Sequence, residues 1–210
     1  MPHGPPNVVV MIEIQGLTRR FGDLTAVDDV SFAVHDGHMT GFVGGNGAGK
    51  TTTMRMTMGL LGVDAGRVLW NGAPITAANR QRTGYMPEER GLYPKQKIVD
   101  QLVYLGELSG MSASDAKAAI MDHLERFGLA DRANDRVEKL SLGNQQRVQI
   151  IAALMTRPEA LILDEPFSGL DPTAVDSMAY LLREHPSRGI PVLFSSHQLY
   201  PIQRICDHLV

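Results

Sequence analysis

The most constraining feature of this 210-residue sequence is the segment GGNGAGKT at residues 44–51, which directly follows the apolar run at residues 40–43. It fits the pattern G-x-x-x-x-G-K-[ST], which requires a strand before it and a helix after it. Glycines let backbone amides turn inward around an anion, and the following helix directs its positive end at the same anion. Met54, Met58 and Leu61 give that helix an inward apolar stripe. The segment therefore predicts a phosphate-binding loop.

Short apolar runs bounded by turn signals predict a β-rich opening. Two dipeptides favour tight hairpins within it: Asp36-Gly37, leading to the strand at 40–43, and Asn71-Gly72. Strands are expected over residues 8–14, 30–34, 40–43, 68–70 and 73–75. The opening is therefore predicted to contain an antiparallel sheet.

Apolar residues at helical spacing follow in the middle of the chain. Two helices are expected, one carrying Val99, Leu102 and Val103 and one carrying Ile120, Leu124 and Phe127. Ser112 with Asp115 resembles a capping box before the second helix, and Gly128 is expected to end that helix. Residues 97–140 therefore look like a small helical insert.

Helices and strands alternate in the last third of the chain. The apolar runs 160–163 and 192–194 predict buried strands, and Asp171-Pro172 predicts the start of a helix between them. Inward helix faces are expected from Val148, Ile151, Ala152 and Met155, and from Val175, Met178, Ala179 and Leu182. This alternation favours an α/β fold with a parallel sheet covered on both faces.

The composition excludes several other classes of protein. A net charge of −3 gives the chain as a whole no cationic surface for nucleic acid or acidic lipid. No apolar run approaches the roughly 18 to 20 residues of a membrane-spanning helix. The single cysteine, Cys206, excludes an internal disulfide framework, and the histidines lack the spacing of metal ligands. A membrane role would therefore require a partner chain.

Charged side chains follow both buried strands of the last third. Asp164-Glu165 comes directly after the strand at 160–163, and His197 closes the run after the strand at 192–194. Open α/β sheets bind ligands at the carboxyl ends of their strands, so we expect these side chains beside the phosphate loop. The alternatives are a chance pair of acids and a histidine with a purely structural role.

These groups suit the hydrolysis of a nucleoside triphosphate. Lys50 would reach the β- and γ-phosphates, and the Thr51 hydroxyl would bind Mg²⁺. Asp164 would bind the same Mg²⁺, through water, and Glu165 would be the general base for the attacking water.

Further motifs occupy the rest of the chain. The letters LSLGNQQR at residues 140–147 and SGLD at 168–171 flank the two acids, and His197 follows them. Phe21-Gly22 precedes the phosphate loop, and GYMPEE at residues 84–89 follows it.

In this order, the motifs closely resemble those of the ATP-binding-cassette (ABC) family of ATPases over roughly residues 11–210. Residues 140–147 look like the family signature LSGGQ, residues 168–171 like its D-loop, and His197 like its switch histidine. Phe21 looks like the aromatic residue that stacks on adenine, and Glu88 lies at the Q-loop position.

The resemblance implies one ABC ATPase domain over residues 1–210. It implies a P-loop (RecA-like) parallel-sheet core with an N-terminal antiparallel β subdomain, over residues 1–96 and 141–210, and an inserted α-helical subdomain over residues 97–140. Because the family normally continues with further strands beyond Val210, the chain is expected to be cut short at its C-terminus.

The resemblance also implies a head-to-tail dimer, in which each ATP lies between the phosphate loop of one subunit and the signature of the other. The implied catalytic residues are Glu165, His197 and Lys50, and the implied Mg²⁺ ligands are Thr51, Glu88 and Asp164. The implied ATP-binding residues are Phe21, Gly44, Asn46, Gly47, Ala48, Gly49, Lys50, Thr51, Thr52, Ser141 and Gly143.

The signature and the Q-loop depart from the family pattern at three positions. Leu142 replaces the first glycine of the signature and Asn144 its glutamine, while Ser141 and Gly143 keep the matching serine and second glycine. Glu88 stands where the family usually has glutamine, and its added negative charge must be compensated by protonation or by distance from the metal. Ser141 as a plain helix N-cap and Glu88 as a solvated loop residue are the alternatives.

The leading hypothesis is the ATP-hydrolysing subunit of an ABC transporter, on the cytoplasmic face of the membrane. Its expected partners are transmembrane permease subunits and a second ATPase subunit, and no nucleic acid is expected. The alternative is a soluble ABC-class ATPase acting on nucleic acid or ribosomes. An ATP-binding switch without hydrolysis is disfavoured by Glu165 and His197, and a GTPase by the lack of an Asn-Lys-x-Asp segment.

Overall fold

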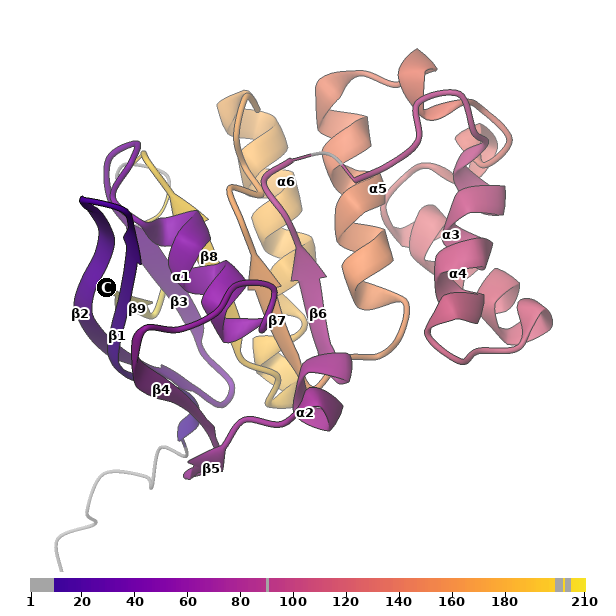
Figure 1. Cartoon of the computed structure of the whole chain (residues 1–210). Helices are drawn as coiled ribbons and strands as arrows, with labels where there is room; N and C mark the ends of the chain where they lie inside the picture. Colours follow the sequence, from indigo (N-terminus) through magenta and orange to yellow (C-terminus); the bar gives the residue numbers. More distant parts are fainter. Residues whose placement is uncertain (1–9, 90, 199–201, 203–204) are drawn as a thin grey trace, which may run out of the picture.

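Two sheets organise the chain, and the computed structural model describes residues 10–89, 91–198, 202 and 205–210 (Figure 1). In chain order the elements are β1 (Val10–Phe21), β2 (Leu24–His35), β3 (Met39–Val43), α1 (Lys50–Thr57), β4 (Ala65–Trp70), β5 (Ala73–Pro74), α2 (Ala77–Gln81), β6 (Thr83–Met86), α3 (Ile98–Leu108), α4 (Ala113–Arg126), η1 (Ala130–Arg132), η2 (Val137–Lys139), α5 (Leu142–Leu154), β7 (Ala160–Leu163), α6 (Pro172–Arg183), η3 (Pro186–Arg188), β8 (Val192–Ser196) and β9 (His208–Leu209).

The first sheet is antiparallel, with the strand order β2-β1-β4-β5. The expected hairpin at Asn71-Gly72 joins β4 to β5, and both of its residues have the positive φ that a tight hairpin turn demands. Val8 and Val9, which the sequence placed in the first strand, lie outside the described residues. The antiparallel opening of the chain is confirmed.

The second sheet is parallel, with the strand order β6-β7-β8-β3-β9. The predicted hairpin at Asp36-Gly37 is therefore wrong, because β2 lies in the antiparallel sheet and β3 in the parallel one. Gly37 does turn the chain sharply, with φ +68°. A turn dipeptide predicts that the chain reverses direction, but it does not determine which strands pair. Here the turn connects a strand of one sheet to a strand of the other.

The parallel sheet is buried on both faces, as its apolar strands predict. On one face Ile162 of β7 and Leu193 of β8 pack in a cluster with Met54 of α1 and Ile14 of the antiparallel sheet. On the other face the alternate residues, such as Phe194, join a cluster with α5, α6 and the helical insert. The α/β fold class predicted from the sequence is confirmed.

The two predicted helices of the insert are α3 and α4. Ser112 caps α4 by accepting a hydrogen bond from the Asp115 N–H, and Gly128, with φ +68°, follows the end of α4. The prediction for α1 was partly wrong, because α1 ends at Thr57 and Gly59 turns the chain with φ +70°. Met58 and Leu61 therefore lie beyond the helix rather than in its apolar stripe.

Among the helices of the described residues, none has the length and apolar character needed to cross a membrane.

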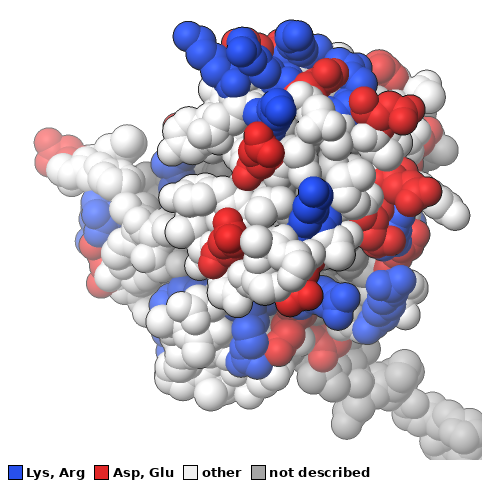
Figure 2. Space-filling model, turned by 90° about the vertical axis from the view of Figure 1, so that its right-hand side faces the viewer, with Lys and Arg blue, Asp and Glu red and all other residues white. Residues whose placement is uncertain are grey.

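On the face beside α3 and α4, acidic and basic side chains are interspersed, with Lys and Arg gathered along the upper edge (Figure 2).

Candidate functional site

The loop between β3 and α1 borders a hollow of about 480 Å³. Gly49 directly precedes α1 with φ +81°, and a Cβ there would lie 2.4 Å from the carbonyl oxygen of Ala26, so only glycine fits. Because α1 begins at Lys50, its unpaired N-terminal amides lie at this loop. The expected ATP-binding residues that line the hollow are Phe21, Asn46, Gly47, Ala48, Gly49, Lys50, Thr51 and Thr52.

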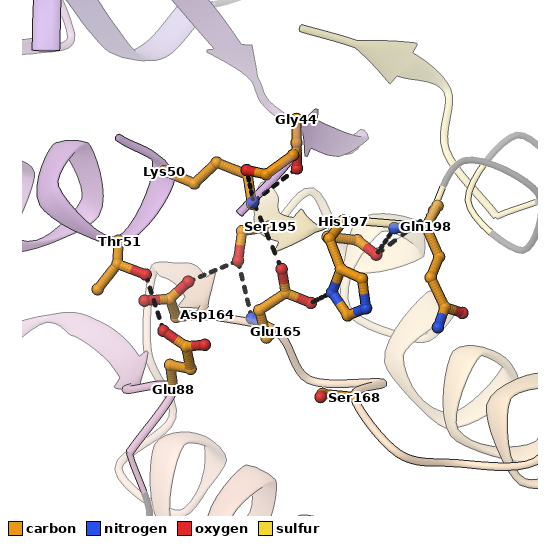
Figure 3. A network of polar contacts seen from close by, with 12 residues as sticks. Gly44, Lys50, Thr51, Glu88, Asp164, Glu165, Ser168, Ser195, His197 and Gln198 are labelled. Atoms are coloured by element: carbon orange, nitrogen blue, oxygen red, sulfur yellow. Dashed lines mark hydrogen bonds and ion pairs between the residues drawn. The ribbon is translucent and has the colours of Figure 1, made fainter. Parts of the chain in front are cut away.

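Lys50 is buried within the loop and is held by three oxygens. Its Nζ donates to the carbonyl oxygens of Gly44 (2.7 Å) and Gly45 (3.1 Å), and it forms an ion pair with Glu165 Oε1 at 3.6 Å (Figure 3). The ammonium group is thus oriented by its own loop toward the carboxylate that follows β7. Gly44, which was also predicted to bind ATP, does not line the hollow; its carbonyl oxygen accepts the hydrogen bond from Lys50.

Glu165 connects Lys50 to His197. Its Oε2 lies 3.0 Å from His197 Nδ1, and its backbone adopts φ +51°, a left-handed conformation that is uncommon for a residue with a side chain. In the parallel sheet β8 lies between β7 and β3, so the ends of these three strands meet at one edge. The structure thus brings Lys50, Glu165 and His197 together, as the sequence predicted.

Asp164 is fully buried beside Thr51 and Glu88. Its Oδ1 accepts a hydrogen bond of 2.6 Å from Ser195 Oγ, while its Oδ2 has no hydrogen-bond partner among the described residues. Burial raises the pKa of Asp164, and the hydroxyls of Ser195 and Thr51 oppose that rise. Thr51 Oγ1 donates to Glu88 Oε2 at 3.1 Å.

These oxygen atoms fit a magnesium ion. Mg²⁺ in nucleotide sites takes one or two carboxylates together with substrate phosphates, and the hydroxyl of a phosphate-loop Thr is a further ligand. The buried, unpaired oxygen of Asp164 is the kind of atom that a cation would satisfy. The structure thus places the three predicted metal ligands, Thr51, Glu88 and Asp164, beside one another.

Phe21 ends β1, is 45% exposed, and lines the hollow. The guanidinium carbon of Arg19 lies 4.9 Å from the centre of its ring, which is a cation–π contact. A nucleobase could therefore stack only on the other face of the ring.

Ser141 and Gly143 are not among the residues that line the hollow. Ser141 is the N-cap of α5, and its hydroxyl accepts a 3.4 Å hydrogen bond from the Asn144 N–H. Gln146, one turn into α5, donates from Nε2 to the carbonyl oxygen of Ser168 at 3.5 Å. The signature helix is thus joined to the turn that follows Glu165 rather than to the phosphate loop.

Sequence reasoning missed one buried residue of this site, Ser195. It contacts Asp164 through its hydroxyl, and the same oxygen accepts the Glu165 N–H at 2.8 Å. The signal was present as a pair of serines at the end of the apolar strand that leads to His197. The hydrogen-bond partners of Ser195, however, depend on the register between β7 and β8, which cannot be predicted from the sequence.

Comparison with known proteins agrees with this geometry. The family model described as "ABC transporter" matches residues 27–168. A solved structure described as the ATP-binding subunit of an ABC transporter superposes with a TM-score of 0.83 at 30% identity, and the match covers 95% of this chain and 85% of that one.

Curated relatives point to the same family. The uncharacterized ABC transporter ATP-binding protein YhaQ of Bacillus subtilis is 46% identical, over 95% of this chain and 67% of that protein. Nod factor export ATP-binding protein I of Burkholderia lata is 38% identical, over 96% of this chain and 67% of that protein. The chain thus spans about two thirds of the length of these relatives. It belongs to the ABC transporter family, as one of its ATP-binding ATPase proteins.

Proposed function

We propose that this chain hydrolyses ATP with Glu165 as the general base and Lys50 and His197 as the groups that contact the phosphates. The observation that carries the proposal is the contact series in which one carboxylate lies 3.6 Å from Lys50 Nζ and 3.0 Å from His197 Nδ1. Lys50 would hold the β- and γ-phosphates. His197 would orient the Glu165 carboxylate and then bind the γ-phosphate.

Thr51, Asp164 and Glu88 would hold Mg²⁺ in this proposal. The bound ion supplies compensation for the negative charge that develops on the transferring phosphoryl group. Phe21 would contact adenine, and the remaining loop amides would surround the phosphates.

The second half of each ATP site would come from another subunit. Ser141 and Gly143 lie at the start of α5, where helix amides favour an anion, yet they do not line the hollow of their own chain. This placement supports a head-to-tail dimer, in which they would face the γ-phosphate that is bound to the partner.

Transmembrane permease subunits are the proposed partners, with this chain at the cytoplasmic face of the membrane. Membership of the ABC transporter family supports this assignment over a soluble ATPase that acts on nucleic acid or ribosomes. The name of the Nod factor export relative, and the Glu88 loop that resembles exporter-like ATPases, support export as the direction of transport.

The test is Glu165→Gln, which keeps the size of the side chain and removes the base. Steady-state ATP hydrolysis should fall by about 100-fold or more, because general bases contribute that much, while ATP affinity stays within about twofold. Glu107→Gln, an exposed position on α3, is the matched control and should hydrolyse ATP normally. Turnover by Glu165→Gln at the rate of the unmodified protein would refute the role of Glu165.

A further inference from the structure

Ser195 is the point at which β8 joins both acidic residues of the site. The parallel pairing of β7 with β8 places Leu163 opposite Phe194, so the next residue on each strand brings Asp164 level with Ser195. Ser195 is fully buried; its Oγ donates to Asp164 Oδ1 at 2.6 Å and accepts the Glu165 N–H at 2.8 Å (Figure 3).

This double contact matters because of the backbone at Glu165. A residue with a side chain at φ +51° is strained, and such a conformation persists only where its surroundings hold it. The Ser195 hydroxyl is the partner of the N–H at that residue, and it also fixes one of the two Asp164 oxygens. One hydroxyl thus contacts both the carboxylate of Asp164 and the backbone of Glu165.

The next residue, Ser196, does not share this role. Its Oγ is bonded to the backbone of Gln198, with the Gln198 N–H donating at 3.1 Å. Removing the Ser195 hydroxyl would leave the buried Asp164 Oδ1 without its hydrogen-bond donor, and would leave the Glu165 N–H without its acceptor.

We propose that Ser195 is a positioning residue for hydrolysis, which holds Asp164 toward the metal and Glu165 toward the attacking water. The inference rests on the proposed function, because it acts through the roles given there to Asp164 and Glu165. Ser195 touches no nucleotide in this account, so its loss should lower the rate of the chemical step and spare nucleotide binding.

The experiment compares Ser195→Ala, Ser195→Thr and Ser195→Val in the full-length protein. In Ser195→Ala, kcat should fall about 10- to 100-fold, as for other residues that orient site ligands, while KM for ATP stays within about threefold. Ser195→Thr and Ser195→Val have the same shape and differ only in the hydroxyl, so Thr should restore most of the lost kcat and Val should not.

Thr40→Val is the matched control for loss of a buried hydroxyl. Thr40 lies in the same sheet and is fully buried, and its Oγ1 has no hydrogen-bond partner among the described residues, so kcat should not change. Equal kcat for Ser195→Thr and Ser195→Val would overturn the proposal, even if Ser195→Ala fails to fold. If Glu165→Gln abolishes turnover while Ser195→Ala is fully active, the inference fails and the proposed function stands. Full activity of Glu165→Gln would refute the proposed function itself.

Discussion

At the scale of single residues, a small number of contacts holds Lys50 and Glu165 in place. Lys50 donates to two carbonyl oxygens of its own loop and pairs with Glu165, and all of these contacts lie in a largely buried setting. Water screens such contacts little, so a charge removed here has a larger effect than the same change at the surface. Lys50 pairs with one oxygen of the Glu165 carboxylate, and His197 contacts the other.

Lys50→Ala should therefore weaken ATP binding strongly. The loss of charge-assisted hydrogen bonds to phosphate is expected to cost about 1.5–3 kcal/mol, which is roughly 10- to 150-fold in Kd. Calorimetric titration with ATP measures this directly. Lys117→Ala, an exposed position on α4, should bind ATP normally. An unchanged Kd for Lys50→Ala would remove the phosphate-loop assignment.

At the scale of elements, the phosphate loop works because its backbone can take conformations that side chains forbid. Gly49 lies at φ +81° against the carbonyl oxygen of Ala26, whereas Gly45 of the same loop has open space where a Cβ would lie. The loop geometry therefore requires a glycine at position 49 but has room for a side chain at position 45.

Gly49→Ala should distort the loop, because the added Cβ would meet a backbone atom at 2.4 Å. We expect ATP affinity to fall by about tenfold or more, since left-handed strain alone costs about 1–2 kcal/mol. Gly45→Ala is the matched control and should bind ATP within about threefold of the unmodified protein. Equal affinities for the two variants, measured by fluorescent-nucleotide titration, would contradict the loop geometry.

Elements with strong local signals were predictable from the sequence. The loop before α1, the hairpin at Asn71-Gly72 and the N-cap at Asp171 each depend on a few adjacent residues, and all three are confirmed. The short strands β6 and β9 were missed, because neither TGYM nor HL is the continuous apolar run that is typical of a buried parallel strand. The hairpin predicted at Asp36-Gly37 was wrong because the pairing of β2 and β3 depends on distant strands, which the dipeptide does not specify.

The residues of the candidate site likewise divide into those that the sequence predicted and those that it did not. Lys50, Glu165 and His197 were found because each follows a recognisable strand, and the edge of a parallel sheet brings such ends together. Ser195 was not found, because its importance comes from its alignment with Asp164 across two strands. The cation–π contact of Arg19 with Phe21 was likewise invisible in the sequence.

At the scale of the whole molecule, an ion pair links helix α4 to the segment that follows helix α6. Arg126 at the end of α4 pairs with Glu184, which follows α6. His185 lies beside this pair, and its pKa is lowered to about 4, first by burial and then by the positive charges of His123, Arg188 and Arg126. His185 is therefore neutral in the folded protein at neutral pH.

This shift makes stability depend on pH. Below its usual pKa of 6.5, His185 takes up a proton in the unfolded chain but not in the folded one, so the free energy of unfolding should fall as the pH drops from 6.5 toward 4. For this partly exposed group we expect a loss of about 1–2 kcal/mol between pH 7 and pH 5. Urea unfolding at both values, with His185→Gln as the comparison, measures it. An equal pH dependence in the variant would show that other groups are responsible.

The central claim is that Lys50, Asp164, Glu165 and His197 act on one triphosphate, and a structure of Glu165→Gln with ATP and Mg²⁺ tests it most directly. The account predicts phosphate oxygens in contact with Lys50 Nζ and the loop amides, the metal beside Thr51 and Asp164, and the γ-phosphate within reach of His197. ATP bound away from this strand edge, or a γ-phosphate that contacts neither Lys50 nor His197, would contradict it.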